Sequence, residues 1–264
     1  MPDVAGDRDA TWEEIRGASK DRASGAADIA RRAAAALASL PRTDLEAAVQ
    51  SLVEGHPSMA PLWRLGSAAL AAEDHARAAI DFAEAIVAER DAVGRVAAGV
   101  LRGPVVTHSY SSSVVAAVAT AGVPALCARS EPGGEGAVTA ERLRERGAKA
   151  EVVSDREAVR AAADGRAIVT GADAVGPGGV VNKVGTRALA EAAAAGGGDR
   201  YAVAGRSKLL AQDLPTPLPF ERTSLDLFTG ILTEEGMLKP EEAGRAASAH
   251  SLHPALRHLL ARLG

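Results

Sequence analysis

The residues best suited to chemistry lie in one block, 171–186, which reads Gly-Ala-Asp-Ala-Val-Gly-Pro-Gly-Gly-Val-Val-Asn-Lys-Val-Gly-Thr. It follows an apolar run, Ala167–Thr170, that is typical of a buried parallel strand. Asp173 therefore stands just past the carboxyl end of that strand, the edge where open α/β sheets bind ligands. Glycines let the backbone approach a ligand, and a helix start favours anions. The pattern fits a ligand site with a carboxylate; the alternative is a glycine-rich turn in which Asp173 caps a helix.

A second polar stretch follows another predicted strand, Val105–Thr107, and continues His-Ser-Tyr-Ser-Ser-Ser before a helical pattern begins. Hydroxyl groups and the free N–H groups of a helix start can converge on one phosphate. A single serine would suffice as an N-cap, and this run exceeds that need. We therefore expect Ser111, Ser112 and Ser113 to bind the phosphate of a sugar phosphate or a nucleotide.

The elements that must position these residues change in type along the chain. Helical spacing of apolar residues dominates residues 25–101, whereas short apolar runs alternate with helices after Gly103. The strand candidates are Val105–Thr107, Ala125–Ala128, Glu151–Val153, Ile168–Thr170 and Tyr201–Ala204. Such alternation favours a parallel sheet with right-handed crossovers.

We therefore predict an α/β protein in two domains. Residues 1–102 form an amino-terminal helical domain, and residues 103–264 form a Rossmann-like parallel sheet with flanking helices. The tail, 224–263, is expected to add further helices. The ligand pocket is expected at the carboxyl edge of the first and fourth strands.

Composition excludes several classes of function. The net charge is −4 with acids and bases interspersed, which does not indicate nucleic-acid binding. Cys127 is the single cysteine, so an intrachain disulfide and a cysteine-rich zinc site are excluded. We predict no metal site and no cofactor. No apolar run approaches the ~20 residues that span a bilayer, and the amino terminus lacks a signal-peptide core. We expect a cytoplasmic protein that does not bind membranes.

The block at 171–186 resembles the Gly-Ala-Asp…Asn-Lys-x-Gly-Thr signature of the translation initiation factor two-B family. That family comprises the alpha, beta and delta regulatory subunits of the factor. It also includes isomerases acting on methylthioribose 1-phosphate and ribose 1,5-bisphosphate. The stretch Thr107-His-Ser-Tyr-Ser is similar to the family's corresponding turn, and more closely to that of the regulatory subunits.

The resemblance implies roles for individual residues. Asp173 matches the aspartate of the isomerases, whereas Ser109 stands where they carry a catalytic cysteine. Asn182 and Lys183 match a pair that contacts the sugar and phosphate, and Lys208 matches a further family lysine. A serine hydroxyl ionises far above the working range unless a base activates it. Catalysis by Asp173 with Ser109 is therefore the alternative rather than the favoured function.

Two departures from the isomerases concern phosphate binding. They have Arg-Gly-Ala where this chain has Ser24-Gly25-Ala26, and Arg-Pro where it has His56-Pro57. Arginine binds phosphate in a bidentate manner that neither serine nor histidine replaces, so a single phosphate is expected. The resemblance also implies a homodimer through the carboxyl-terminal domain.

Together these features favour a protein related to the regulatory subunits that binds a phosphorylated sugar or nucleotide in a regulatory or binding role. The alternative is an aldose–ketose sugar-phosphate isomerase that uses Asp173. Whether the protein is an enzyme stays open at this point.

Overall fold

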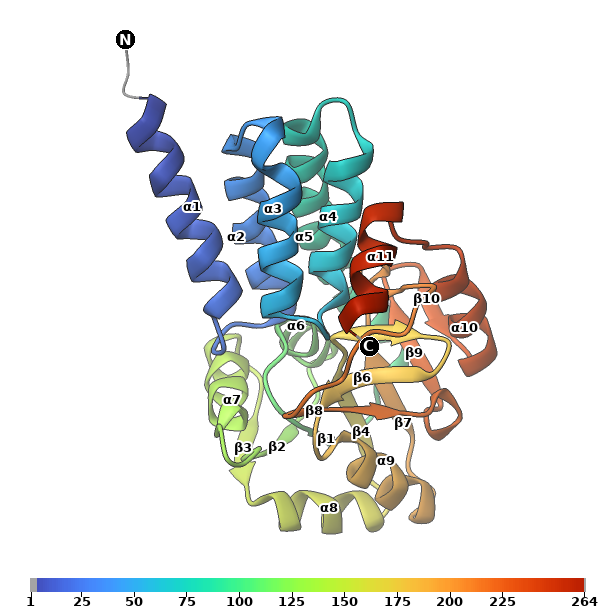
Figure 1. The fold of residues 1–264 in the computed structure, drawn as a ribbon. Coiled ribbons are helices and arrows are strands. Elements are labelled where there is room, and N and C mark those ends of the chain that lie inside the picture. The colour runs from blue at the N-terminus through green and yellow to red at the C-terminus, as the bar shows by residue number, and fades with distance from the viewer. Residues whose placement is uncertain (1–3, 264) are drawn as a thin grey trace.

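The computed structural model describes residues 4–263 and begins with a layer of helices (Figure 1). These helices are α1 (Val4–Lys20), α2 (Ala26–Ser39), α3 (Arg42–Gly55), α4 (Ala60–Ala71) and α5 (His75–Val100). Their shared core is rich in alanine and leucine and includes the fully buried Trp63. Small side chains allow close helix approach: a Cβ at Gly66 of α4 would overlap Val49 of α3.

A mostly parallel sheet forms the second part of the molecule. Its strands are β1 (Val105–Thr107), β2 (Ala125–Ala128), β3 (Ala150–Val153), β4 (Ala167–Gly171), β7 (Arg200–Val203), β9 (Gly230–Thr233) and β10 (Gly236–Leu238). They lie in the order β10-β9-β7-β4-β1-β2-β3, and β10 alone among these strands is antiparallel. The flanking helices are α6 (Ser112–Ala121), α7 (Glu135–Glu145), α8 (Asp155–Ala163) and α9 (Thr186–Ala195). The predicted α/β fold, with an amino-terminal helical region before a parallel sheet, is confirmed.

The block 171–186 folds differently from the expected βα turn. It contains a hairpin of β5 (Ala174–Gly176) and β6 (Gly179–Lys183), which pairs with β8 (Phe220–Thr223) in a small antiparallel sheet. The valines of the hairpin are buried, so they gain from pairing in a sheet. Gly179 has φ +135°, and a Cβ there would overlap the carbonyl of Thr223. A glycine that indicates a loop in the sequence thus permits the close approach of β6 to β8.

The tail also departs from the all-helical expectation. Strands β9 and β10 lie within residues 224–263, ahead of α10 (Pro240–Ser248) and α11 (Pro254–Leu263). Ile231 and Leu232 are fully buried in the sheet. The four residues of β9, of which Ile231 and Leu232 are large and apolar, are too few to be assigned to strand or helix by their periodicity alone.

The two parts of the chain are closely joined. Helix α11 returns to pack on α3 and α4, while the second half of α5 packs on α6. Ile86 of α5 belongs to the helical core, and Val93 of the same helix belongs to the core beside the sheet. The division into domains at residue 102 stays a prediction.

Candidate functional site

A cleft of about 540 Å³ lies between the helical layer and the carboxyl edge of the sheet. The helical side contributes residues 21–26 and 54–59, and the sheet side contributes Ser109, Tyr110, Glu135, Asp173, Asn182, Lys183 and residues 217–220. The strand order reverses between β1 and β4, because β2 follows β1 on one side and β4 lies on the other. Such a switch point opens a crevice in open α/β sheets, which is where this cleft is found.

Asp173 is half-buried in the cleft, between the two parts of the chain. Its backbone N–H donates to the Val181 carbonyl at 2.7 Å, and its carbonyl accepts from the N–H of Ala60 at 2.9 Å. Burial raises the pKa of the Asp173 carboxyl to about 6, although the positive charge of Lys208 acts in the opposite direction. A carboxyl that titrates near neutrality is suited to exchanging protons or to hydrogen bonding in either state.

This raised pKa predicts a pH-dependent stability. The folded state holds the Asp173 proton up to about pH 6, so the contribution to stability is complete at low pH and is lost as the pH rises through 6. Asp173→Asn should therefore stabilise the protein at pH 8 by about 2 kcal/mol more than at pH 4.5. Urea denaturation at both pH values measures the difference. Asp164→Asn, at an exposed carboxylate, is the control, and equal effects of the two substitutions would contradict the prediction.

Lys208 lies beneath the cleft and is only 5% exposed. Its ammonium group makes no hydrogen bond or ion pair with any residue between 4 and 263, although Asp173, Glu89 and Asp28 are near enough to attract it. Burial lowers the pKa of the Lys208 ammonium, against the effect of these carboxylates. Lys208 and Asp173 line a recess of about 20 Å³, which is large enough for one small group such as a water molecule.

The amino terminus of α2 forms another wall of this recess. Gly25 begins the helix with no side-chain cap, and Gly25 and Ala26 line both the recess and the cleft. The first N–H groups of a helix lack intrahelical partners and favour anions. Ser24 brings no positive charge here, but Arg22 of the same loop lines the cleft. Arg22 could not be recognised from its local sequence, since nothing in the pattern distinguishes it from a surface arginine.

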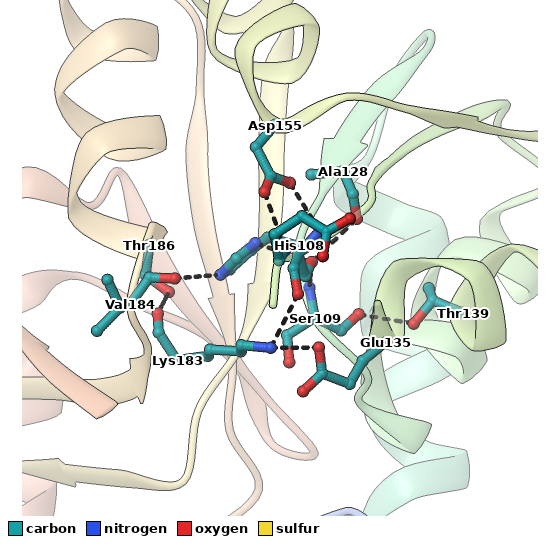
Figure 2. Close-up of polar contacts among 11 residues, drawn as sticks. His108, Ser109, Ala128, Glu135, Thr139, Asp155, Lys183, Val184 and Thr186 are labelled. Carbon is teal, nitrogen blue, oxygen red and sulfur yellow. Dashed lines mark hydrogen bonds and ion pairs between the residues drawn. The ribbon is translucent and has the colours of Figure 1, made fainter. Parts of the chain in front are cut away.

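Asn182 and Lys183 come together on β6, as their spacing implies. Asn182 is 6% exposed, lines both the cleft and the recess, and donates to the Thr186 hydroxyl at 2.9 Å. The Lys183 ammonium donates to the Ser130 carbonyl at 3.0 Å and forms an ion pair with Glu135 (Figure 2). Lys183 is therefore already paired within the protein.

Ser109 lines the cleft in a left-handed backbone conformation, with φ +61°. Its N–H donates to the Ser130 hydroxyl at 2.7 Å, and its carbonyl accepts from the Thr139 hydroxyl at 2.7 Å (Figure 2). Ser130 is also left-handed, with φ +66°. Two hydrogen bonds thus hold the strained turn after β1 against the neighbouring segments.

His108 stabilises the same turn and does not activate Ser109. Its Nδ1 lies 3.1 Å from the Ser130 hydroxyl, and its Nε2 lies 2.9 Å from the Val184 carbonyl (Figure 2). Burial lowers the pKa of His108, so the ring is neutral at pH 7 and its Nε2–H donates to Val184. Among residues 4–263, no group forms a hydrogen bond with the Ser109 side chain. The turn therefore shows no base that would make this hydroxyl a nucleophile.

The three serines 111–113 lie at the start of α6 and do not all face the same site. Ser111 caps the helix by accepting from the Val114 N–H, and Ser111 and Ser112 line the recess. Ser113 is buried on another side, in a small hollow beside Glu89 and Lys208. The structure places two of the three serines near the α2 terminus, and their role in phosphate binding stays a prediction.

Other candidate chemistry is limited in the described part of the chain. Cys127 lies in the core, where burial raises the pKa of its thiol to about 12. Residues 4–263 contain no group of three or more histidine, cysteine or acidic side chains arranged to hold a metal ion. Within the same range, no helix is long and apolar enough to cross a bilayer.

Comparisons with known proteins place the chain among relatives. Solved structures with the same fold include translation initiation factor eIF-2B from Pyrococcus horikoshii OT3, with 24% identity, a TM-score of 0.78, and coverage of 91% of this chain and 98% of that one. The 5-methylthioribose 1-phosphate isomerase from the same organism has 20% identity and a TM-score of 0.65, covering 96% and 88%. A tetrameric eIF2B-beta2-delta2 complex from C. thermophilum has 15% identity and a TM-score of 0.74, covering 92% and 94%.

These structural likenesses show a shared fold. A search among curated proteins finds no match. The model of the Initiation factor 2 subunit family matches residues 19–217, which is most of the chain. The protein therefore belongs to the Initiation factor 2 subunit family.

Proposed function

We propose that this protein binds a phosphorylated sugar or nucleotide in the cleft, in a regulatory or binding role. The observation that carries the proposal is Lys208, a buried ammonium group without a hydrogen-bond or ion-pair partner among residues 4–263. Burying a charge without a partner is unfavourable. The uncapped amino terminus of α2 adds positive potential to the same recess. A phosphate at the mouth of the recess would compensate the charge of Lys208 and the positive potential of the α2 terminus.

The rest of the cleft suits the sugar. Asp173 and Asn182 extend from the recess into the cleft, where a carboxylate and an amide can bind hydroxyl groups. The volume of about 540 Å³ falls in the range typical of small-molecule sites. A ligand with its phosphate at the recess and its hydroxyls along Asp173 and Asn182 fits both features.

The alternative, a sugar-phosphate isomerase, is supported by one observation. The pKa of Asp173, about 6, suits a group that moves protons in an aldose–ketose isomerisation. A structural relative is an isomerase of 5-methylthioribose 1-phosphate. Ser109 lacks a base among residues 4–263, however, so the second proton-transferring group that such a reaction uses is not evident. Binding without turnover is the function that the site supports best.

Thermal denaturation with candidate ligands tests the proposal. Ribose 5-phosphate, methylthioribose 1-phosphate, ribose 1,5-bisphosphate and nucleoside monophosphates are each added to the purified protein. A ligand present at a hundred times its Kd stabilises the folded state by about 2.7 kcal/mol, which raises the melting temperature by several degrees. The unphosphorylated sugars are the control and should have no effect. If no phosphorylated compound raises the melting temperature, the proposed function is wrong.

The same compounds separate the two functions. Incubation followed by NMR should show each compound unchanged if the protein only binds. Conversion of an aldose phosphate to a ketose phosphate that is abolished in Asp173→Asn would establish the isomerase instead. The homodimer through residues 103–264 stays a proposal, for which light scattering of the purified protein is the measurement.

A further inference from the structure

We propose that Glu135 makes the cleft selective for ligands with a single phosphate, because it neutralises Lys183. The inference rests on the proposed function and names the class of ligand that the same site accepts. Glu135 would thus determine the specificity of the site.

The ion pair between Glu135 and Lys183 is built into the wall of the cleft. Glu135 begins α7, and Lys183 ends β6, so the ion pair joins a helix that flanks the large sheet to a strand of the small one (Figure 2). The Lys183 side chain is 7% exposed and that of Glu135 is 29% exposed. Ser130 supplies a second partner for the ammonium through its carbonyl at 3.0 Å. Lys183 therefore offers little uncompensated charge to a ligand.

The other charged side chains of the cleft do not supply a free cation in place of Lys183. Among the described lining residues, the basic side chains are Arg22 and Lys183, whereas Asp21, Glu54, Glu135 and Asp173 are acidic. Arg22 lies at the surface of the loop and donates to the carbonyl groups of Ser19 and Asp21. Asp21 is paired with Arg32 and Glu135 with Lys183, so Glu54 and Asp173 remain against the single cation of Arg22. A second phosphate would thus enter a region where unpaired carboxylates outnumber unpaired cations.

The cleft has two distinct ends. Asp173 and Asn182 line both the cleft and the recess that holds Lys208. Glu135 and Lys183 line the cleft but not the recess. A phosphate at the recess therefore leaves the other end of the ligand on the side of Glu135. An uncharged hydroxyl can donate to that carboxylate, whereas a second phosphate finds no free cation there and lies against a carboxylate in a partly buried site. Repulsion of the wrong ligand is a recognised source of specificity.

Calorimetric titration with ribose 5-phosphate and ribose 1,5-bisphosphate tests the inference. The wild type should bind the monophosphate more tightly than the bisphosphate. In Glu135→Gln, which keeps a hydrogen-bonding group beside Lys183, affinity for the bisphosphate should rise roughly tenfold or more. Affinity for the monophosphate should change by less than about threefold.

Two further variants test whether the gain in bisphosphate affinity comes from the Lys183 ammonium. Glu131→Gln removes an exposed carboxylate of the same segment, paired with Arg129 at 3.8 Å, and should leave both affinities unchanged. Lys183→Met should abolish the gain produced by Glu135→Gln, and by itself it should not raise the affinity for the bisphosphate, because it leaves the Glu135 carboxylate without its partner. This double-mutant cycle assigns the gain to the released ammonium rather than to a general change of charge.

The outcomes distinguish the inference from the proposed function. If the wild type binds the bisphosphate more tightly, the inference is wrong whatever the variants do. It is also wrong if Glu135→Gln is folded, binds the monophosphate and shows the same ratio of affinities as the wild type; the proposed function then stands. If neither compound binds the wild type or Glu135→Gln, both the inference and the proposed function are overturned.

Discussion

Replacing Lys208 with methionine is expected to weaken binding of ribose 5-phosphate roughly a hundredfold, because truncating one partner of a buried charge pair typically has an effect of this size. The reason is the position of the ammonium, which is 5% exposed and adjoins the recess at the α2 terminus. A phosphate placed there loses its nearest buried cation in the variant. Arg22 cannot replace it, since that side chain lies on the exposed loop of the cleft.

The same substitution should leave the protein equally stable or more stable. The pKa of Lys208 is lowered because burial disfavours the charged form more than the surrounding carboxylates favour it. Folding therefore disfavours the ammonium form of Lys208, which the unfolded state accommodates more easily. Methionine has a similar length and no charge, and replacing a buried charged group with an apolar one is often neutral or stabilising.

Calorimetry and urea denaturation of Lys208→Met measure the two effects separately. Lys149→Met, at an exposed lysine, is the matched control and should change neither quantity. Wild-type affinity in Lys208→Met would show that the recess is not the phosphate site. A loss of several kcal/mol in stability would instead show that Lys208 supports the fold.

Ser130→Ala is expected to lower the free energy of unfolding by about 3 kcal/mol, because it leaves buried hydrogen-bonding groups without partners. The serine is fully buried, and its hydroxyl accepts from the Ser109 N–H at 2.7 Å. The same hydroxyl lies 2.9 Å from the Ala128 carbonyl and 3.1 Å from His108 Nδ1. Its loss also releases the left-handed turn at Ser109 in the cleft wall, so ligand affinity should fall as well.

A second substitution separates the effect of losing the Ser130 hydroxyl from the effect of the left-handed backbone conformation. Ser130→Gly loses the same hydrogen bonds, but glycine adopts φ +66° without strain and should be less destabilising than alanine by about 1 kcal/mol. Ser248→Ala, at an exposed helical serine, is the control for urea denaturation. Stability of Ser130→Ala equal to that of the wild type would contradict the assigned role of the hydroxyl.

Much of the fold follows from local sequence patterns. The residues of β1 and β2 agree with the expected ranges, because each contains an apolar run bounded by turn residues. The strand–helix alternation also places Asp173 at the carboxyl edge, since parallel strands with right-handed crossovers all end there. The block 171–186 additionally indicates the family, which the family model shows.

The hairpin of β5 and β6 was not predictable in the same way. Its partner β8 lies at residues 220–223, and β6 pairs with β8 across this separation. Register between distant strands depends on burial on both faces rather than on a local period. The same holds for β9, because its short apolar run becomes a strand by pairing with β7 and β10.

The sequence by itself determined which side chains reach the sheet edge, because the alternation of strands and helices is encoded locally and parallel strands end at the same edge. Asp173, Asn182 and Lys183 are examples, and the structure brings all three to one cleft. Only the tertiary structure decided their electrostatic state. Lys183 is neutralised by Glu135, whereas Lys208 is buried without a hydrogen-bond or ion-pair partner among residues 4–263. The charge that a lysine offers to a ligand depends on burial and on the carboxylates packed around it, and those neighbours come from distant segments of the chain.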